Sequence, residues 1–73
     1  MMSFVNEAAE AIRNTLVICT DDREFEIASN AIIEFCSAFE MDDKEIISAL
    51  NIASGNSSQE DDCIDEIIRR IKL

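Results

Sequence analysis

Apolar residues recur every three or four positions along this chain, which is the spacing that places side chains on one face of a helix. A first helix is predicted at about residues 4–19, with Ser3 placed to cap it. Its apolar stripe consists of Val5, Ala8, Ile12 and Leu16.

A second helix, the longest, is predicted at about residues 22–40, because Asp21 and Glu24 have the spacing of a helix start. Its stripe consists of Phe25, Ala28, Ile32, Phe35 and Phe39, widened by Ile27, Ala31, Cys36 and Ala38.

Two shorter stripes follow. A third helix is predicted at about residues 43–53, capped by Asp42, and its apolar residues are Ile46, Ala49, Leu50 and Ala53. The segment SGNSS is the strongest turn signal, because Gly55 can adopt the left-handed conformation that ends a helix. Ser57 and Glu60 then have capping-box spacing and begin a fourth helix at about residues 58–72. That helix should bury Ile64, Ile67, Ile68 and Ile71.

The composition agrees with an all-α fold, because the chain has no proline and one glycine and so lacks the punctuation of a β-rich protein. We predict a single acidic domain, 1–73, folded as a small compact bundle of four helices. The second helix should lie at the hydrophobic centre, with the first and fourth along it and the third bridging them. A chain this short buries only about 60% of its unfolded surface, so we expect a homodimer or an obligate complex with another protein.

One apolar residue of the second helix lies outside the stripe. Ile33 falls on the opposite, polar face, among Glu26, Asn30, Glu34 and Ser37. Single surface isoleucines are common and usually bind nothing. An isoleucine within a polar face can also mark an interface, so Ile33 with Glu26, Asn30 and Glu34 is one candidate partner-binding surface.

The charge of the chain restricts the chemistry of its partners. Sixteen acidic residues against six basic ones give a formal net charge of −10 at pH 7. The electrostatic field of such a chain repels nucleic acid and anionic membranes and attracts basic proteins. The alternative is that the acidic surface only keeps the protein in solution. The strips DDREFE and QEDDCIDE both begin predicted helices, where acids are stabilised by the helix dipole. They supply the remaining candidate partner-binding residues, which are Asp21, Asp22, Glu60, Asp61 and Asp62.

Catalytic and metal chemistry finds no support in the sequence. The chain has no histidine, nucleophile elbow, phosphate-binding loop or calcium loop. Cys19, Cys36 and Cys63 are widely spaced, which favours neither a zinc site nor a disulfide framework. We therefore expect no enzymatic activity, no cofactor and no metal, and three inert cysteines that are buried or half-buried.

The segment DDKEIISALNIASG has the helix and turn that begin a helix-turn-helix module. In such modules the second helix enters the major groove, and lysines and arginines neutralise phosphates. Here that helix begins with SSQEDD. Three acids at its leading end would be repelled by DNA, so we do not expect direct binding to nucleic acid.

The N-terminal segment carries Glu7 and Glu10 where a signal peptide would be apolar, and the longest apolar run is LVIC. We expect a cytoplasmic protein with no membrane partner. Together these features predict a non-enzymatic protein-interaction module that regulates, inhibits or escorts a partner protein. Small acidic chaperones, immunity proteins and antitoxins all have this physical profile. The alternative is a nucleic-acid mimic whose carboxylates block a DNA-binding protein, and salt dependence of binding separates the two.

Overall fold

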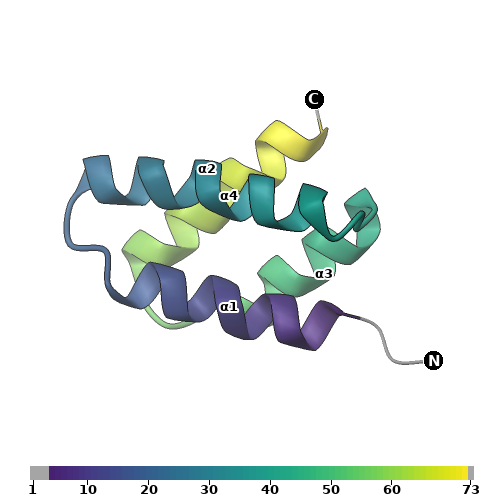
Figure 1. Cartoon of the computed structure of the whole chain (residues 1–73). Coiled ribbons are helices and arrows are strands. Elements are labelled where there is room, and N and C mark those ends of the chain that lie inside the picture. Colours follow the sequence, from purple (N-terminus) through teal and green to yellow (C-terminus); the bar gives the residue numbers. More distant parts are fainter. Residues whose placement is uncertain (1–3, 73) are drawn as a thin grey trace.

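The computed structural model describes residues 4–72 and folds them into four α-helices (Figure 1). Helix α1 spans Val5–Val17, α2 spans Asp22–Ala38, α3 spans Asp43–Ala53 and α4 spans Ser58–Lys72. No strand occurs within the described residues. The predicted all-α bundle of four helices is confirmed, and the predicted bounds of the third and fourth helices are those observed.

Side chains near the chain turns fix where the second and third helices begin. The Asp21 carboxylate accepts a hydrogen bond from the Glu24 N–H at 2.8 Å, which caps α2. At α3, Asp42 accepts from the Glu45 N–H at 2.9 Å and the Glu45 carboxylate accepts from the Asp42 N–H at 3.2 Å. This reciprocal pair is a capping box, which satisfies two backbone donors that a helix start otherwise leaves free.

The starts of α1 and α4 differ from each other. Phe4 occupies the N-cap position of α1 and makes no side-chain cap hydrogen bond, whereas the predicted cap, Ser3, lies outside the described residues. At α4, the Ser57 hydroxyl accepts from the Glu60 N–H at 3.2 Å and donates to the Glu60 carboxylate at 2.9 Å. The pairing of Ser57 with Glu60 is therefore as predicted.

Two residues with positive φ lie in the turns after α2 and α3. Glu40, at φ 55°, follows α2, and its N–H donates to the Ser37 carbonyl at 3.0 Å while the Met41 N–H donates to the Cys36 carbonyl at 3.2 Å. These two bonds form a Schellman motif, in which the left-handed position is usually glycine. Gly55, at φ 98°, follows α3 as predicted.

The helices pair differently from the expected arrangement around α2. The most extensive contact is between α1 and α3, and α2 packs mainly against α4. Small residues explain the close pairing of α1 with α3, because alanines let two helix backbones approach. The alanines of these two helices that are at most 1% exposed are Ala8, Ala9, Ala49 and Ala53.

The core is shared by all four helices rather than centred on one. The largest fully buried side chains are Ile12, Leu16, Cys36, Leu50, Ile64 and Ile67. Of the predicted α2 stripe, Ala28 and Ile32 are buried, whereas Phe25 and Phe35 are half-buried and Phe39 is 48% exposed. Among the described residues, no helix combines the length and apolar character needed to cross a bilayer.

Candidate partner-binding surfaces

Helices α1 and α2 run side by side in opposite directions, with α4 passing behind them in the view of Figure 1. Between them lie two adjoining hollows of about 280 and 160 Å³, which share Thr15 and Ala31 as lining residues. We call this feature the α1–α2 groove. Its defining residues are Ala11, Thr15 and Ile18 from α1 and the turn after it, and Ile27, Ala31 and Phe35 from α2.

The α1–α2 groove exposes large apolar side chains at one end. Ile18 is 74% exposed and Ile27 is 59% exposed, and both line the larger hollow. Burying an isoleucine side chain fully stabilises a protein by about 1.5–3 kcal/mol relative to leaving it exposed. Two isoleucines left in water on facing edges of one groove therefore form an apolar surface that folding has not used.

Aromatic residues extend this apolar surface at the other end. The Phe35 ring, which lines the smaller hollow, lies 4.8 Å from the Phe39 ring between centroids. The Phe39 ring in turn lies 5.6 Å from that of Phe4. Phe4 and Phe39 are about half exposed, at 50% and 48%. The chain thus carries apolar side chains along both ends of the groove.

A carboxylate is held in its charged form at the isoleucine end. Glu24 lines the larger hollow, and its carboxylate accepts hydrogen bonds from the Thr20 hydroxyl at 2.6 Å and the Thr20 N–H at 2.7 Å. The bond from the hydroxyl is the largest cause lowering the pKa of Glu24, followed by the bond from the backbone. This edge of the groove is therefore negatively charged at neutral pH.

The periodicity of α2 predicts Ile27 in the apolar stripe that faces the core, whereas Ile27 lies on an exposed edge of the groove together with Ile18. The stripe on α2 covers about half of the helix circumference, which is wider than the surface that α1 and α4 cover, so Ile27 and Ala31 remain exposed. The run LVIC contained a signal for Ile18, because one helix face cannot bury four consecutive apolar residues.

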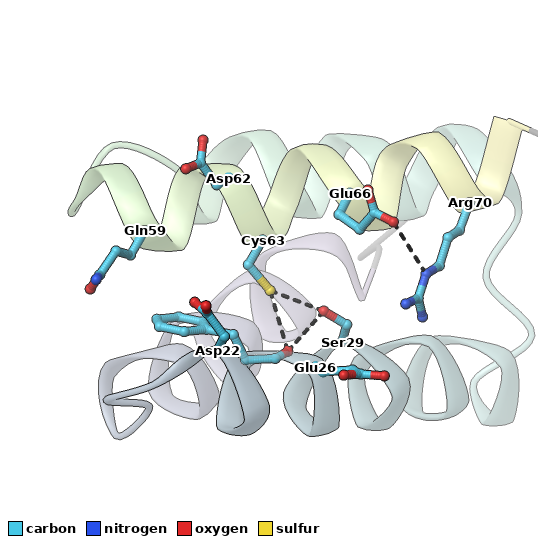
Figure 2. Close-up of a pocket in the computed structure, with 9 residues that line it drawn as sticks. Asp22, Glu26, Ser29, Gln59, Asp62, Cys63, Glu66 and Arg70 are labelled. Carbon is cyan, nitrogen blue, oxygen red and sulfur yellow. Dashed lines mark hydrogen bonds and ion pairs between the residues drawn. The ribbon is translucent and has the colours of Figure 1, made fainter.

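A second cleft, of about 260 Å³, lies between α2 and α4 and has an acidic rim (Figure 2). Asp22 and Glu26 reach it from α2, whereas Asp62 and Glu66 reach it from α4. The two acidic strips, which are far apart in the sequence, therefore meet at one cleft. Of the predicted partner-binding residues, this cleft brings together Asp22, Glu26 and Asp62.

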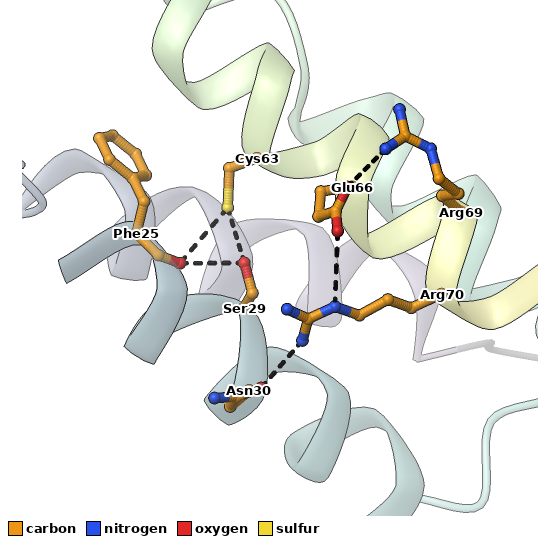
Figure 3. Close-up of polar contacts among 7 residues, drawn as sticks. All are labelled: Phe25, Ser29, Asn30, Cys63, Glu66, Arg69 and Arg70. Atoms are coloured by element: carbon orange, nitrogen blue, oxygen red, sulfur yellow. Dashed lines mark hydrogen bonds and ion pairs between the residues drawn. The ribbon is translucent and has the colours of Figure 1, made fainter. Parts of the chain in front are cut away.

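The floor of the α2–α4 cleft is closed by a buried polar contact (Figure 3). The Ser29 hydroxyl, on a residue that is 3% exposed, donates to the Phe25 carbonyl at 2.9 Å. The Ser29 oxygen lies 3.0 Å from the Cys63 sulfur. Either of these two atoms can donate to the other, and the Cys63 sulfur also lies 3.7 Å from the Phe25 carbonyl oxygen, which is a second acceptor for the thiol proton. This network satisfies the buried hydroxyl and joins α2 to α4.

Arginine side chains neutralise one end of the same cleft. Arg70 donates to the Asn30 side chain at 2.9 Å and lies 3.9 Å from the Glu66 carboxylate, which also pairs with Arg69 at 2.8 Å (Figure 3). The pairs are exposed, so each contributes little to stability. The acidic excess of the cleft therefore lies at the Asp22 and Asp62 end.

The position of Ile33 differs from the expected one. Ile33 is half-buried and packs against the hydrophobic core, whereas Glu26, Asn30 and Glu34 around it are exposed. The helical wheel places Ile33 on the side of α2 that α4 covers, and sequence periodicity could not reveal that neighbour. Ile33 is thus not an exposed apolar anchor on a solvent face.

Three predicted acidic residues have local roles. Asp21 caps α2, and Glu60 pairs with Ser57 at the start of α4. The Asp61 carboxylate accepts from the Gly55 N–H at 2.7 Å, which ties the turn to α4. These local hydrogen bonds explain why acidic residues occur at the three positions, and no binding partner is needed to explain them.

The three cysteines are free, and Cys36 and Cys63 are buried while Cys19 is half-buried. Burial raises the pKa of the Cys36 thiol. Burial, followed by the negative charge of Glu24, raises the pKa of Cys19. A raised pKa keeps a thiol protonated and weakly nucleophilic. Within residues 4–72, no three His, Cys, Asp or Glu side chains are grouped so that they could hold a metal ion.

The chain matches no protein-family model, no curated protein and no solved structure.

Proposed function

We propose that this protein is a non-enzymatic interaction module that binds another protein through the α1–α2 groove and thereby regulates, inhibits or escorts it. The observation that carries this proposal is the exposure of Ile18 and Ile27, at 74% and 59%, on the two edges of one groove. Apolar patches rimmed by polar residues are typical of protein–protein interfaces.

The energetics favour a covered groove. The buried side chains of Ile12 and Ile32 already line the smaller hollow, so the exposed isoleucines are not needed to close the fold. Covering Ile18 and Ile27 with a partner would stabilise the complex by roughly 1–2 kcal/mol each. A domain of this size gains more from such burial than a large one, because its own core is small.

A nucleic-acid mimic is the second candidate function. It is favoured by the gathering of Asp22, Glu26 and Asp62 from two helices at one cleft. The local roles of Asp21, Glu60 and Asp61 weaken it, because acids that cap helices need no partner. We therefore place protein binding through the apolar groove first.

The test is capture of a partner from a host-cell lysate on the immobilised protein, compared among matched variants. Ile27→Asp places a charge in the groove and should abolish capture. Val17→Asp is the control, because Val17 is 66% exposed and does not line the groove. Circular dichroism should show that both variants remain folded.

The mimic predicts the opposite pattern. A double variant, Asp22→Asn with Asp62→Asn, would then lose the partner, Ile27→Asp would retain it, and moderate salt would release a basic nucleic-acid-binding protein. Unchanged capture by a folded Ile27→Asp variant contradicts the groove as the binding surface.

A further inference from the structure

The shape and charge of the α1–α2 groove indicate the chemistry of the partner that it binds. We propose that its occupant is one amphipathic helix of another protein, with apolar residues facing the groove and lysines or arginines along its flanks. This inference rests on the proposed function, because it names the chemistry of the partner at the same groove.

The shape of the groove fits a helix. Its middle is lined by the small or short side chains of Ala11, Thr15 and Ala31, whereas Ile27 and Phe35 stand toward its ends. A low floor between taller residues lets a third helix approach two antiparallel ones at close range. Helix α1 has 13 residues and is about 20 Å long, so the groove can contact roughly three to four turns of a partner helix. An amphipathic helix lying in such a groove is a recurring mode of recognition.

The edges of the groove are acidic. Glu7 precedes Ala11 by four residues and Glu34 follows Ala31 by three, so helical spacing places both exposed residues on the groove side of their helices. Glu24 lines the isoleucine end and is held in its charged form by Thr20. Acids on both edges attract basic residues on the two flanks of a bound helix.

Few bases offset these acids. Of the two arginines on α1 and α2, Arg13 donates to the Ile52 carbonyl on α3 at 2.8 Å, away from the groove. Arg23 precedes Ile27 by four residues, so the same helical spacing places it on the groove side of α2, where it offsets one of the acidic residues. The whole chain carries a net charge of −10, which adds a long-range attraction for a basic partner.

A second copy of this chain fits the groove less well. A two-fold dimer uses the same patch on both subunits, so the acidic edges of one groove would face those of the other. Two chains of charge −10 would also repel each other on approach. Charge complementarity thus favours a basic helix over self-association.

Two synthetic peptides of roughly 18 residues test the inference by nuclear magnetic resonance titration of the labelled protein. Both carry leucines at helical spacings of three and four. One has lysines on the flanks, and the other has glutamates in their place. The lysine peptide should shift the amide signals of Ala11, Thr15, Ile27 and Ala31, and the glutamate peptide should bind at least about tenfold more weakly.

Variants and salt give independent readouts of the same binding. Ile27→Asp should weaken binding of the lysine peptide about tenfold or more, whereas Val17→Asp should leave it unchanged. Raising the ionic strength from about 0.05 to about 0.5 M should reduce the difference between the two peptides, because salt screens exposed charges.

Each contrary result overturns a stated part of the inference. Equal affinity for both peptides rejects the basic flanks, and failure of the lysine peptide to bind rejects the helical occupant. Signal shifts confined to Asp22, Glu26 and Asp62 move the binding to the α2–α4 cleft. If the protein dimerises with rising concentration and the amide signals of the groove shift as it does so, the occupant is a second copy of this chain rather than a basic helix. The proposed function survives the loss of peptide binding if Ile27→Asp still abolishes capture of the natural partner, so the two failures are distinguishable.

Discussion

Helix α1 forms two interfaces of opposite character. Its most extensive contact is with α3, and its residues Ala8 and Ala9 are each 1% exposed. Toward α2, Ala11 and Thr15 line open hollows, and Ile18 beyond the end of the helix is 74% exposed. One side of the helix therefore closes a core, while the other leaves an apolar groove.

Residue size alone does not explain this difference, because alanines occur at both interfaces. The residues of α1 and α3 that are at most 1% exposed include Ala8, Ala9, Ala49 and Ala53, and such small side chains let the two backbones approach closely. Between α1 and α2, the buried side chains of Ile12 and Ile32 lie at the base of the smaller hollow. These side chains separate the helices, so Ala11 and Ala31 leave a hollow above them. A small residue closes an interface only where its neighbours are small as well.

The largest expected difference in the free energy of unfolding is between alanine-to-leucine substitutions at the two interfaces of α1. Ala49→Leu overpacks the contact between α1 and α3, where Ala49 is 0% exposed, and should lower the free energy of unfolding by about 2–3 kcal/mol. Ala31→Leu adds the same atoms to the open groove and should change that free energy by less than about 0.5 kcal/mol. Urea denaturation measures both. Equal destabilisation would mean that the groove is as tightly packed as the closed interface.

Two of the three isoleucines on α2, Ile27 and Ile33, extend the contrast to the side facing α4. Ile33→Asp places a charge against the core and should lower the free energy of unfolding by about 2 kcal/mol. Ile27→Asp should change it by less than about 0.5 kcal/mol, because Ile27 is 59% exposed. Thermal and urea unfolding of the two variants gives the comparison. A fully stable Ile33→Asp variant would show that Ile33 faces solvent after all.

Stability and groove binding can be separated at the end of α2. Glu40→Gly should raise the free energy of unfolding by about 0.5–1 kcal/mol, because glycine adopts a φ of 55° without the steric penalty of a side chain. Glu40→Ala is the control, since it removes the charge and keeps the penalty. Binding of the lysine peptide should be the same in both. A gain in the alanine variant as large as in the glycine variant would assign the effect to charge.

The smallest effect concerns the turn that joins α1 to α2. Because the pKa of Glu24 is lowered in the folded state, its contribution to stability is present above the pH at which an unfolded glutamate titrates and is lost as the pH falls through the folded pKa. Thr20→Val removes the hydroxyl donor, so the pKa of Glu24 should rise and stability should decline less steeply on acidification. Thr20→Ser should behave like the wild type. Carbon-detected titration of Glu24 together with unfolding at several pH values tests this, and an unchanged pKa in Thr20→Val would contradict it.

Local sequence was enough to predict the number of helices and most of their ends. The pairs Asp42 with Glu45 and Ser57 with Glu60 lie three residues apart, so the hydrogen bonds that begin α3 and α4 need no distant partner. Gly55 likewise adopts its positive φ within a turn. The net charge of −10 also follows from composition alone.

The tertiary structure decided which side of each helix is covered. Periodicity identifies an apolar face, but it does not say which neighbours will lie against that face or how far they will extend. The pairing of α1 with α3 left Ile27 exposed, and the pairing of α2 with α4 covered Ile33. The same pairing brought Asp22 and Asp62 to one cleft. These outcomes depend on contacts between residues far apart in the chain, which no local pattern encodes.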